Sequence, residues 1–128
     1  MNNQSAVAET RRCLANIERF DGEVNAFISV LSDSALAEAE RADAESCRGD
    51  GRGLLAGVPI SVKDCIDVAG VRCTNGTRFF EDYVPQKDAL IVDRLRRAGA
   101  VIIGKTNLHE FAYGSTTQNP HYGSTRNP

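Results

Sequence analysis

One stretch, residues 53–67, constrains the fold of this chain more than any other, and its sequence is GLLAGVPISVKDCID. It is rich in β-branched apolar residues, and Ser61 is the only polar interruption before Lys63. This pattern is typical of a short strand that is buried on both faces, as in the middle of an α/β sheet. Gly57 and Pro59 mark the entry to the strand, where a proline disturbs the ladder least.

Lys63 stands where the predicted strand ends. In open α/β sheets, ligands and chemistry collect at the carboxyl ends of the strands. An apolar strand would deliver this lysine poorly hydrated, and desolvation favours the neutral amine, which can take a proton from a hydroxyl nucleophile. The alternative is that Lys63 only ends the strand and extends its ammonium group to water, as most lysines do. We interpret the nearby Asp64 and Asp67 as residues that orient Lys63 or balance its charge.

The segment before this strand predicts two helices. Apolar residues recur at helical spacing over residues 6–20, and Asp21–Gly22 is expected to end that helix. Residues 24–31 form a mixed apolar patch that fits either a strand or a packed loop. A second helix is predicted over residues 32–44, with its first or second residue as N-cap. Its apolar stripe is thin, which favours a position on the surface.

The segment after the strand predicts a second strand and the helix that connects the two. The helix is expected over residues 88–98, with Asp88 as N-cap and Gly99 at its C-terminal end, and a buried strand follows over residues 100–103. The order strand, helix, strand predicts parallel pairing, and therefore an α/β fold with an at least partly parallel sheet. Three aromatic residues before this helix are expected to be buried against a neighbouring element: Phe79, Phe80 and Tyr83.

The remaining segments are irregular. Residues 47–53, CRGDGRG, are expected to form a flexible connection, and residues 107–113 a short helical turn. Residues 114–128, GSTTQNPHYGSTRNP, are polar and punctuated by Gly and Pro without a period. Because two strands do not make a sheet that is stable alone, we expect further polypeptide to follow Pro128.

Composition and charge argue against several classes of function. A net charge of −2 provides no basic field for nucleic acid, and we interpret the cluster Arg94, Arg96 and Arg97 as a solvated helix face. No apolar run reaches membrane-spanning length, and the polar start MNNQSAVAET is no secretory signal. We therefore expect a cytoplasmic protein that contacts neither nucleic acid nor membrane directly, with its four scattered cysteines reduced.

The motifs that would indicate a cofactor or a metal are interpreted as accidental. Residues 99–106, GAVIIGKT, match the phosphate-binding pattern GxxxxGK followed by Ser or Thr, but the four intervening residues form the predicted strand instead of a curled loop. The glycines of CRGDGRG precede a strand, which is the wrong order for a dinucleotide loop. Four possible metal ligands lack ligand spacing: Asp64, Asp67, His109 and His121. We expect no cofactor and no metal.

Several separated blocks together resemble one known family. They are DGEVNAFISV, GVPISVKDCIDVAGVRCTNGT and DALIVDRLRRAGAVIIGKTNLHEFAYGSTTQNPHYGSTRNP, which agree with the family in order and spacing over about residues 21–128. The combination is similar to the amidase signature family, which includes the glutamyl-tRNA amidotransferase A-subunit-like enzymes. The resemblance implies an α/β fold, a mixed sheet wrapped by helices, that is incomplete in this chain. The 128 residues would form the N-terminal portion of a single amidase domain, with a helical lead-in over about 1–50 and the start of the α/β core over about 53–128.

The resemblance also implies amide hydrolysis through a Ser–cis-Ser–Lys triad. Lys63 falls on the triad lysine, which takes the proton of the nucleophilic serine through a bridging serine while the nucleophile attacks the amide carbon. Residues 113–118 match the segment that lines the substrate cavity, with Tyr113 and Ser115 as the candidates for substrate binding. The family's serine-rich glycine block and its nucleophile are absent from this sequence and are expected beyond Pro128, so the chain alone is predicted to be inactive.

Two alternatives stay open at the level of sequence. The resemblance does not separate a general amidase, acting on a small-molecule linear amide, from the A-type subunit of an amidotransferase, which assembles with partner subunits. A different class of function is a non-catalytic binding module, or pseudo-enzyme fragment, that keeps an amidase-like half-fold. Such a module would bind a partner through an exposed sheet edge.

Overall fold

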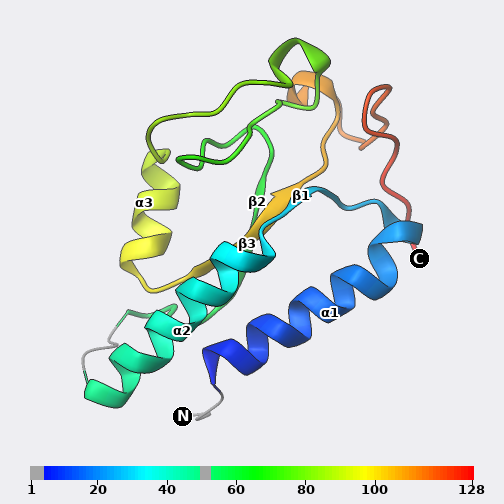
Figure 1. Cartoon of the computed structure of the whole chain (residues 1–128). Helices are drawn as coiled ribbons and strands as arrows, with labels where there is room; N and C mark the ends of the chain where they lie inside the picture. Colours follow the sequence, from blue (N-terminus) through cyan, green and yellow to red (C-terminus); the bar gives the residue numbers. More distant parts are fainter. Residues whose placement is uncertain (1–4, 50–52) are drawn as a thin grey trace.

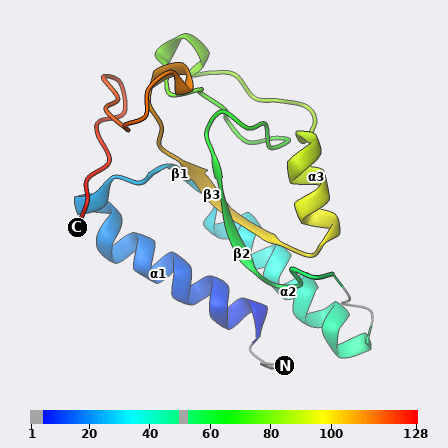
Figure 2. The same ribbon diagram turned by 180° about the vertical axis from the view of Figure 1, so that it is seen from behind.

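The computed structural model describes residues 5–49 and 53–128, which form an α/β fold (Figures 1 and 2). In chain order the helices and strands are α1 (Ala6–Val24), β1 (Phe27–Val30), α2 (Ser32–Arg48), β2 (Pro59–Lys63), α3 (Leu90–Arg97) and β3 (Val101–Thr106). Short 3₁₀ turns lie at Arg78–Phe80 and Glu110–Ala112. The middle of the predicted flexible connection, residues 50–52, lies outside the described residues.

The strands form one mixed sheet in the order β1–β3–β2. β3 pairs parallel with β2 and antiparallel with β1, which confirms the predicted parallel pairing of the two later strands. α1 and α2 pack together on one face of the sheet, and α3 packs on the other (Figures 1 and 2). The apolar patch at residues 24–31, which fitted either strand or loop, contains β1.

β2 is an edge strand, so the prediction of a strand buried on both faces is wrong for it. Ile60 and Val62 pack toward α3, whereas Ser61 and Lys63 are exposed. The strand buried on both faces is β3, in which every residue of 101–105 is buried. An apolar run indicates burial, but it does not show which strand will find partners on both sides.

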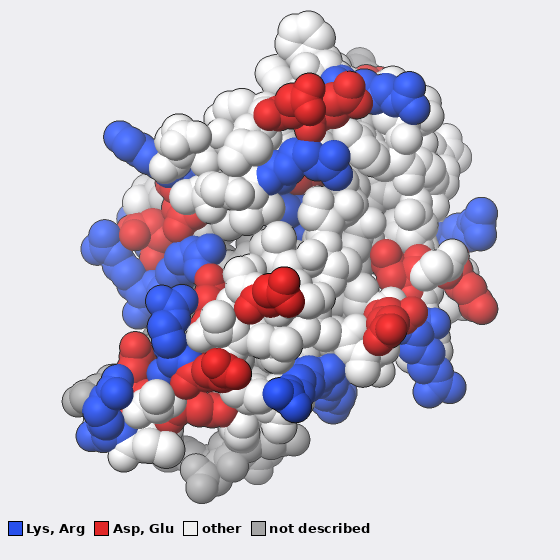
Figure 3. Space-filling view, viewed as in Figure 1, with Lys and Arg blue, Asp and Glu red and all other residues white. Residues whose placement is uncertain are grey.

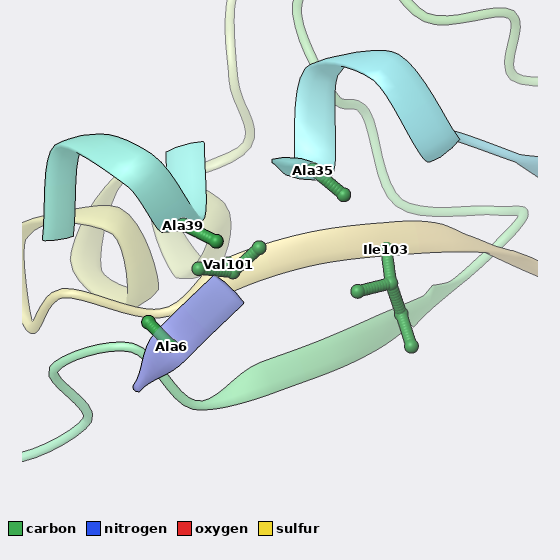
Figure 4. Packing of buried hydrophobic residues seen from close by; sticks show 5 residues of the cluster. All are labelled: Ala6, Ala35, Ala39, Val101 and Ile103. Atoms are coloured by element: carbon green, nitrogen blue, oxygen red, sulfur yellow. The ribbon is translucent and has the colours of Figure 1, made fainter. Parts of the chain in front are cut away.

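The alanines of α2 form its contact with the sheet. Ala35 and Ala39 are fully buried and pack with Ala6 of α1 against Val101 and Ile103 of β3 (Figure 4). Small side chains let the helix axis approach the strand closely, because the distance between packed elements depends on the side chains at the contact. The thin apolar stripe of α2 therefore faces the sheet, and the prediction of a surface position is wrong for this face of the helix.

Helices α1 and α2 are longer than predicted. α1 continues through Asp21–Gly22 and ends at Asn25, whose φ of 55° is left-handed. α2 runs to Arg48 and ends at Gly49, with φ of 80°. The N-cap of α2 is Leu31, without a side-chain hydrogen bond, instead of either predicted residue. A single glycine disfavours a helix by about 1 kcal/mol, which the packing of α1 on α2 outweighs.

Helix α3 begins two residues later than predicted, because Asp88 has other partners. The N-cap is Ala89. The Asp88 carboxylate accepts a hydrogen bond from the Ala69 N–H at 2.7 Å and lies 3.1 Å from the Arg96 guanidinium group. It therefore ties α3 to the loop after β2 instead of capping the helix.

Some of the charged residues near the surface form ion pairs. Arg96 forms ion pairs with Glu38 and Asp88, and Arg97 lies 3.0 Å from Asp93. On the face shown in Figure 3, acidic and basic side chains are intermixed. Arg94 and Arg97 are exposed, as the interpretation of the cluster as a solvated helix face requires, whereas Arg96 is half-buried and joins α3 to Glu38 of α2. None of the helices in the described ranges combines the length and the apolar character that a bilayer-crossing segment needs.

The three aromatic residues before α3 are more exposed than expected. Phe79 is 82% exposed and Tyr83 is 45% exposed, so the prediction of burial is wrong for both. Phe80 lies half-buried between them and makes edge-to-face contacts with both rings and with Phe111, at centroid distances of 4.9, 6.1 and 6.3 Å. Phe79, Tyr83 and Phe111 thus contact the ring of Phe80 instead of filling a core.

A bulge in β3 decides which face of the sheet Lys105 occupies. The β2–β3 register shifts between Ile60 and Ser61, so β3 carries one extra residue. After the shift, Lys105 lies opposite Val62 and shares its face of the sheet, toward α3. With regular alternation, Lys105 would share the opposite face with Ile103, in the core formed with α1 and α2.

Gly104 of β3 has no room for a side chain. A Cβ there would lie 2.7 Å from the Ser29 carbonyl oxygen and 2.8 Å from the Phe27 ring. We expect Gly104→Ala to lower the free energy of unfolding by about 1–3 kcal/mol, because the paired backbone of β1 cannot move aside. Gly22→Ala is the matched control: nothing lies within 4 Å of its Cβ in α1, so a gain of about 0.5–1 kcal/mol is expected. Urea denaturation measures both, and equal stability of the two variants would contradict this explanation.

The polar segment 114–128 contains no helix or strand, as predicted, but buried amides hold it in place. Asn119 is 5% exposed, and its side chain donates to the carbonyl oxygens of Gly76 and Leu108 at 2.8 Å each. The same side chain accepts hydrogen bonds from two backbone N–H groups of the segment itself. Asn119 therefore fixes the segment to the loops that follow β2 and β3.

A second anchor lies at the C-terminal end of α1. The Asn25 side chain donates to the Tyr122 carbonyl oxygen at 2.9 Å. The backbone carbonyl oxygen of Asn25 accepts a hydrogen bond from Thr125 Oγ1 at 2.9 Å. Asn107, directly after β3, donates to the carbonyl oxygens of Asn25 and Gly123. The end of α1, the end of β3 and the polar segment are thus joined at one point.

Candidate active site

Lys63 ends β2 at the edge of the sheet where β3 also ends, because the two strands are parallel. Its partner in the register is Thr106, the last residue of β3. The Lys63 side chain is exposed, so the expectation of a poorly hydrated lysine is not met in this chain. Within the described residues, no carboxylate forms an ion pair with Lys63.

The carboxylate next to Lys63 is paired with a different lysine. Asp64 and Lys105 are both fully buried, and Asp64 Oδ1 lies 3.0 Å from Lys105 Nζ. The prediction that Asp64 and Asp67 orient or neutralise Lys63 is therefore wrong, since Asp67 accepts a hydrogen bond from the Tyr83 hydroxyl at 3.3 Å. Side chains of successive residues in an extended chain point to opposite sides. The Asp64 side chain therefore points into the protein and the Lys63 side chain points to solvent.

Asp64 also fixes the loop that follows β2. Its Oδ2 accepts hydrogen bonds from the N–H of Thr74, at 2.9 Å, and from the Thr74 hydroxyl. Its carbonyl oxygen accepts from the Asn75 N–H at 2.9 Å, and its N–H donates to the Thr106 carbonyl oxygen at 3.0 Å. The buried pair of Asp64 and Lys105 thus connects the ends of β2 and β3 with the loop that begins at residue 73.

Cys73, in the same loop, is a poor candidate for a nucleophile. Burial raises the pKa of the Cys73 thiol to about 11, and the nearby Lys105 ammonium offsets this only in part. The thiol therefore stays protonated at neutral pH and donates a hydrogen bond to the Asp64 carbonyl oxygen at 3.5 Å. The thiolate is the reactive form of cysteine, and this site does not favour it.

The candidates for substrate binding, Tyr113 and Ser115, directly follow the second 3₁₀ turn. Tyr113 is 92% exposed, Ser115 is exposed as well, and within the described ranges no hydrogen bond joins either of them to Lys63. The turn is attached to the loop after β2, because Phe111 donates its N–H to the Asn75 carbonyl oxygen at 2.9 Å. The segment therefore lies at the edge of the sheet where β2 and β3 end (Figure 1).

The backbone of this turn is strained. Phe111 and Ala112 are consecutive non-glycine residues with φ of 54° and 55°. Each such residue costs on the order of 1–3 kcal/mol and persists only when its surroundings determine it, which happens most often at functional sites. The short helical turn predicted over residues 107–113 is present as a 3₁₀ turn, but it covers only Glu110–Ala112 and contains the non-helical Phe111.

Neither a metal site nor a nucleotide loop is found in the described ranges. Across residues 5–49 and 53–128, no group of three His, Cys, Asp or Glu side chains is placed to hold a metal ion. His121 Nε2 lies 2.8 Å from Glu110 Oε1, and within the described residues this pair has no third side chain placed to complete a metal site. The phosphate-binding pattern is extended: its residues 101–106 are β3, and Lys105 is held by Asp64. The interpretation of that match as accidental is confirmed.

Acid is expected to weaken the contact of Glu110. The Thr77 hydroxyl, and then the contact with His121, lower the pKa of the Glu110 carboxyl below its ordinary value of 4.5. A lowered folded-state pKa gives stability that is present above the unfolded-state value and lost as the pH falls through the folded-state value. Thermal melting should therefore show wild-type protein more stable than Glu110→Gln at pH 7, with a difference that shrinks below about pH 4.5. Glu81→Gln is the control, and a difference that stays constant with pH would contradict the assignment.

Sequence reasoning missed the residues that build this edge of the sheet: Asp64 as the partner of Lys105, Thr74 and Asn119. A signal for one of them was present. Lysine is almost never fully buried without a partner, so a lysine inside the apolar run of β3 required a buried acid nearby. The parallel register places the end of β2, and with it Asp64, beside Lys105. Thr74 and Asn119 had no comparable signal.

Comparisons with known proteins agree with this arrangement. A family model described as Amidase matches residues 8–128. The A-type subunit of the glutamyl-tRNA(Gln) amidotransferase of Gloeobacter violaceus is 47% identical over 125 residues, which cover 98% of this chain and 26% of that protein. Its namesake from Koribacter versatilis is 46% identical over 124 residues, 97% of this chain and 25% of that protein. The chain thus spans about a quarter of the length of these curated relatives.

Solved structures show the same fold. A protein from a vestigial complex that reveals the origins of an s-triazine catabolic enzyme is 42% identical with a TM-score of 0.93, over 98% of this chain and 28% of that one. The native peptide amidase from Stenotrophomonas maltophilia is 34% identical with a TM-score of 0.87, over 97% of this chain and 27% of that one. The sheet, its helices and the loops at its carboxyl edge therefore have close counterparts in larger enzymes.

Proposed function

Because this chain belongs to the amidase signature family, we propose that it supplies the lysine base of an amide-hydrolysing centre, with Lys63 in that role. The observation that carries the proposal is the position of Lys63: it is exposed at the carboxyl end of β2 and has no carboxylate partner within the described residues. A carboxylate partner would favour the ammonium form, which cannot accept a proton. The adjacent carboxylate of Asp64 is instead held by Lys105.

In the proposed reaction, the neutral amine of Lys63 accepts a proton from a bridging serine. The bridging serine takes the proton of a nucleophilic serine as this attacks the amide carbon. The C–N bond then breaks, ammonia or an amine leaves with the proton returned by Lys63, and an ester to the nucleophilic serine remains. Water attacks the ester along the same proton path and releases the carboxylic acid. The resemblance puts the bridging serine in a glycine- and serine-rich block and the nucleophilic serine further along the chain, and these 128 residues contain neither.

We place Tyr113 and Ser115 in the wall of the substrate cavity. Their exposure supports this role, because a side chain without internal partners is available to a ligand. The proposed substrate is a small-molecule linear amide. The names of the relatives support two settings for it, a general amidase and the A-type subunit of an amidotransferase, and the second would require partner subunits.

The test is a chimera in which this chain replaces the matching quarter of the Stenotrophomonas maltophilia peptide amidase. We expect the chimera to keep amide hydrolysis and its Lys63→Met variant to lose it. The 128-residue chain alone is expected to show no turnover, because a triad lysine without its serines has no hydroxyl to deprotonate. Turnover by the isolated chain that disappears in Lys63→Met would contradict the proposed division of the triad.

A second candidate function, a non-catalytic binding module, is favoured by one observation. Within residues 5–49 and 53–128, β1 and β2 each have one partner strand and leave an open edge, and Leu90 and Ile91 of α3 are more than half exposed. A partner strand could add to such an edge through main-chain hydrogen bonds. Cooperative unfolding of the isolated chain as a monomer is a condition of this module, and an aggregating or molten product would exclude it.

A further inference from the structure

A pocket of about 280 Å³ lies beside the loop that follows β2, and Lys63 does not line it. Its walls come from three neighbouring stretches of that loop: Cys65, Asp67, Cys73, Asn75, Phe80 and Tyr83. Small-molecule pockets in proteins typically measure about 300–1,000 Å³, so this one suits a ligand at the small end of that range. Neither the proposed triad nor the candidate substrate wall uses any of these residues.

The pocket carries one unneutralised negative charge. The Asp67 carboxylate accepts a hydrogen bond from the Tyr83 hydroxyl and has no cationic partner within the described residues. The cation behind the pocket, Lys105, is held by Asp64. Burial raises the pKa of the Cys73 thiol to about 11, so this group is neutral at pH 7. Partial desolvation and the nearby Asp67 raise the pKa of Tyr83, which is neutral as well.

The aromatic walls of the pocket also favour a positively charged ligand. Phe80 is held by edge-to-face contacts with Tyr83 and Phe111, at 6.1 and 6.3 Å between ring centroids. The face of an aromatic ring attracts a cation, and the attraction grows when the cation is partly desolvated. Asn75 also lines the pocket, and its side-chain amide is neutral and includes an acceptor oxygen. Carboxylate, rings and amide oxygen all favour a group that is positively charged and donates hydrogen bonds.

We propose that this pocket binds a small primary ammonium ion with an apolar body, with Asp67 as the acceptor of its N–H groups. The pocket has acceptors for an ammonium group, while Phe80 and Tyr83 cover the apolar body. The volume of about 280 Å³ suits a ligand of this size. This site goes beyond the proposed amide hydrolysis and does not depend on it, because Lys63 takes no part.

The test uses benzylamine, which is protonated at pH 7, and benzyl alcohol as its uncharged match. Amide chemical shifts of the 128-residue chain are followed by NMR during titration. Benzylamine is expected to bind with a dissociation constant of about 0.1–1 mM and to shift the amides of the pocket residues. Benzyl alcohol should bind at least about tenfold more weakly, because it lacks the charge that Asp67 recognises.

Variants separate this site from other acidic groups. Asp67→Asn should weaken benzylamine at least about tenfold, whereas Glu81→Gln, which changes an exposed carboxylate outside the pocket, should leave binding unchanged. Lys63→Met should also leave it unchanged, so failure of the catalytic proposal does not affect this result. Equal affinity for the two probes, or shifts confined to other parts of the chain, would overturn the proposal. So would the absence of binding at about 10 mM benzylamine. The comparison of benzylamine with benzyl alcohol uses only the wild-type chain, so it tests the proposal even if Asp67→Asn does not fold.

Discussion

Replacing Lys63 by methionine in the peptide amidase chimera is expected to lower kcat by about three orders of magnitude or more. Members of a catalytic triad act as a unit, so the loss of one removes most of the contribution of all. The chimera should stay folded, because Lys63 forms no ion pair within the described residues that the substitution would break. The measurement is initial-rate kinetics at saturating amide, together with a thermal melt of each variant.

Lys87→Met in the same chimera is the matched control. Lys87 is an exposed lysine in the loop before α3, so its replacement removes the same charge at a distance from the proposed centre. Its kcat should equal that of the unsubstituted chimera. If Lys63→Met keeps more than about a tenth of the activity, Lys63 is not the base and the proposal fails.

Replacing Lys105 by methionine in the 128-residue chain is expected to lower the free energy of unfolding by about 3–5 kcal/mol. The substitution leaves the fully buried Asp64 carboxylate without its counter-charge, and a buried unpaired charge is strongly unfavourable. Domains of this size are stabilised by only about 5–15 kcal/mol, so the loss is a large part of the total. The midpoint of urea denaturation measures it.

The effect should also be local to one part of the fold. The Thr74 and Asn75 N–H groups bond to Asp64, so their hydrogen exchange should accelerate more than that of α1 in Lys105→Met. The double variant Asp64→Leu/Lys105→Met removes both charges and should recover part of the lost stability. Lys87→Met should change the free energy of unfolding by less than about 0.5 kcal/mol. A Lys105→Met chain as stable as this control would show that the pair is not a determinant of stability.

The order of helices and strands was predictable because it is written in local patterns. The apolar periodicities located α1, α2 and α3, and the strand, helix, strand order gave the parallel pairing of β2 and β3. The position of each strand in the sheet was not predictable in this way. β2 and β3 are both short and apolar, and only the presence of β1 on the far side makes β3 the central strand. A sequence pattern describes one strand, whereas its central or edge position depends on all the strands of the sheet.

The candidate site was predictable in part for the same reason. The position of Lys63 at the end of β2 followed from one local run of residues. The identity of its neighbours did not, because Asp64 and Lys105 meet only through the register of two strands and a bulge. Local spacing indicated that Asp64 serves Lys63, and tertiary structure assigns it to Lys105. Hydrogen bonds of side-chain amides such as Asn119 depend on loop geometry that no periodic pattern reports.

The junction at Asn25 has a consequence for the order in which this chain can assemble. Its hydrogen bonds to the polar segment join residues 97 to 100 positions apart, whereas the parallel strands β2 and β3 are much closer in sequence. Contacts across long sequence separations require the largest loops to close and tend to form late in folding. A nascent chain would therefore have its helices and the β2–β3 pair in place before the segment that carries Tyr113 and Ser115 is attached. The C-terminal end of α1 thus holds the loop next to the proposed centre in its conformation. Shortening this end of α1 would disorder that loop before it unfolded the sheet.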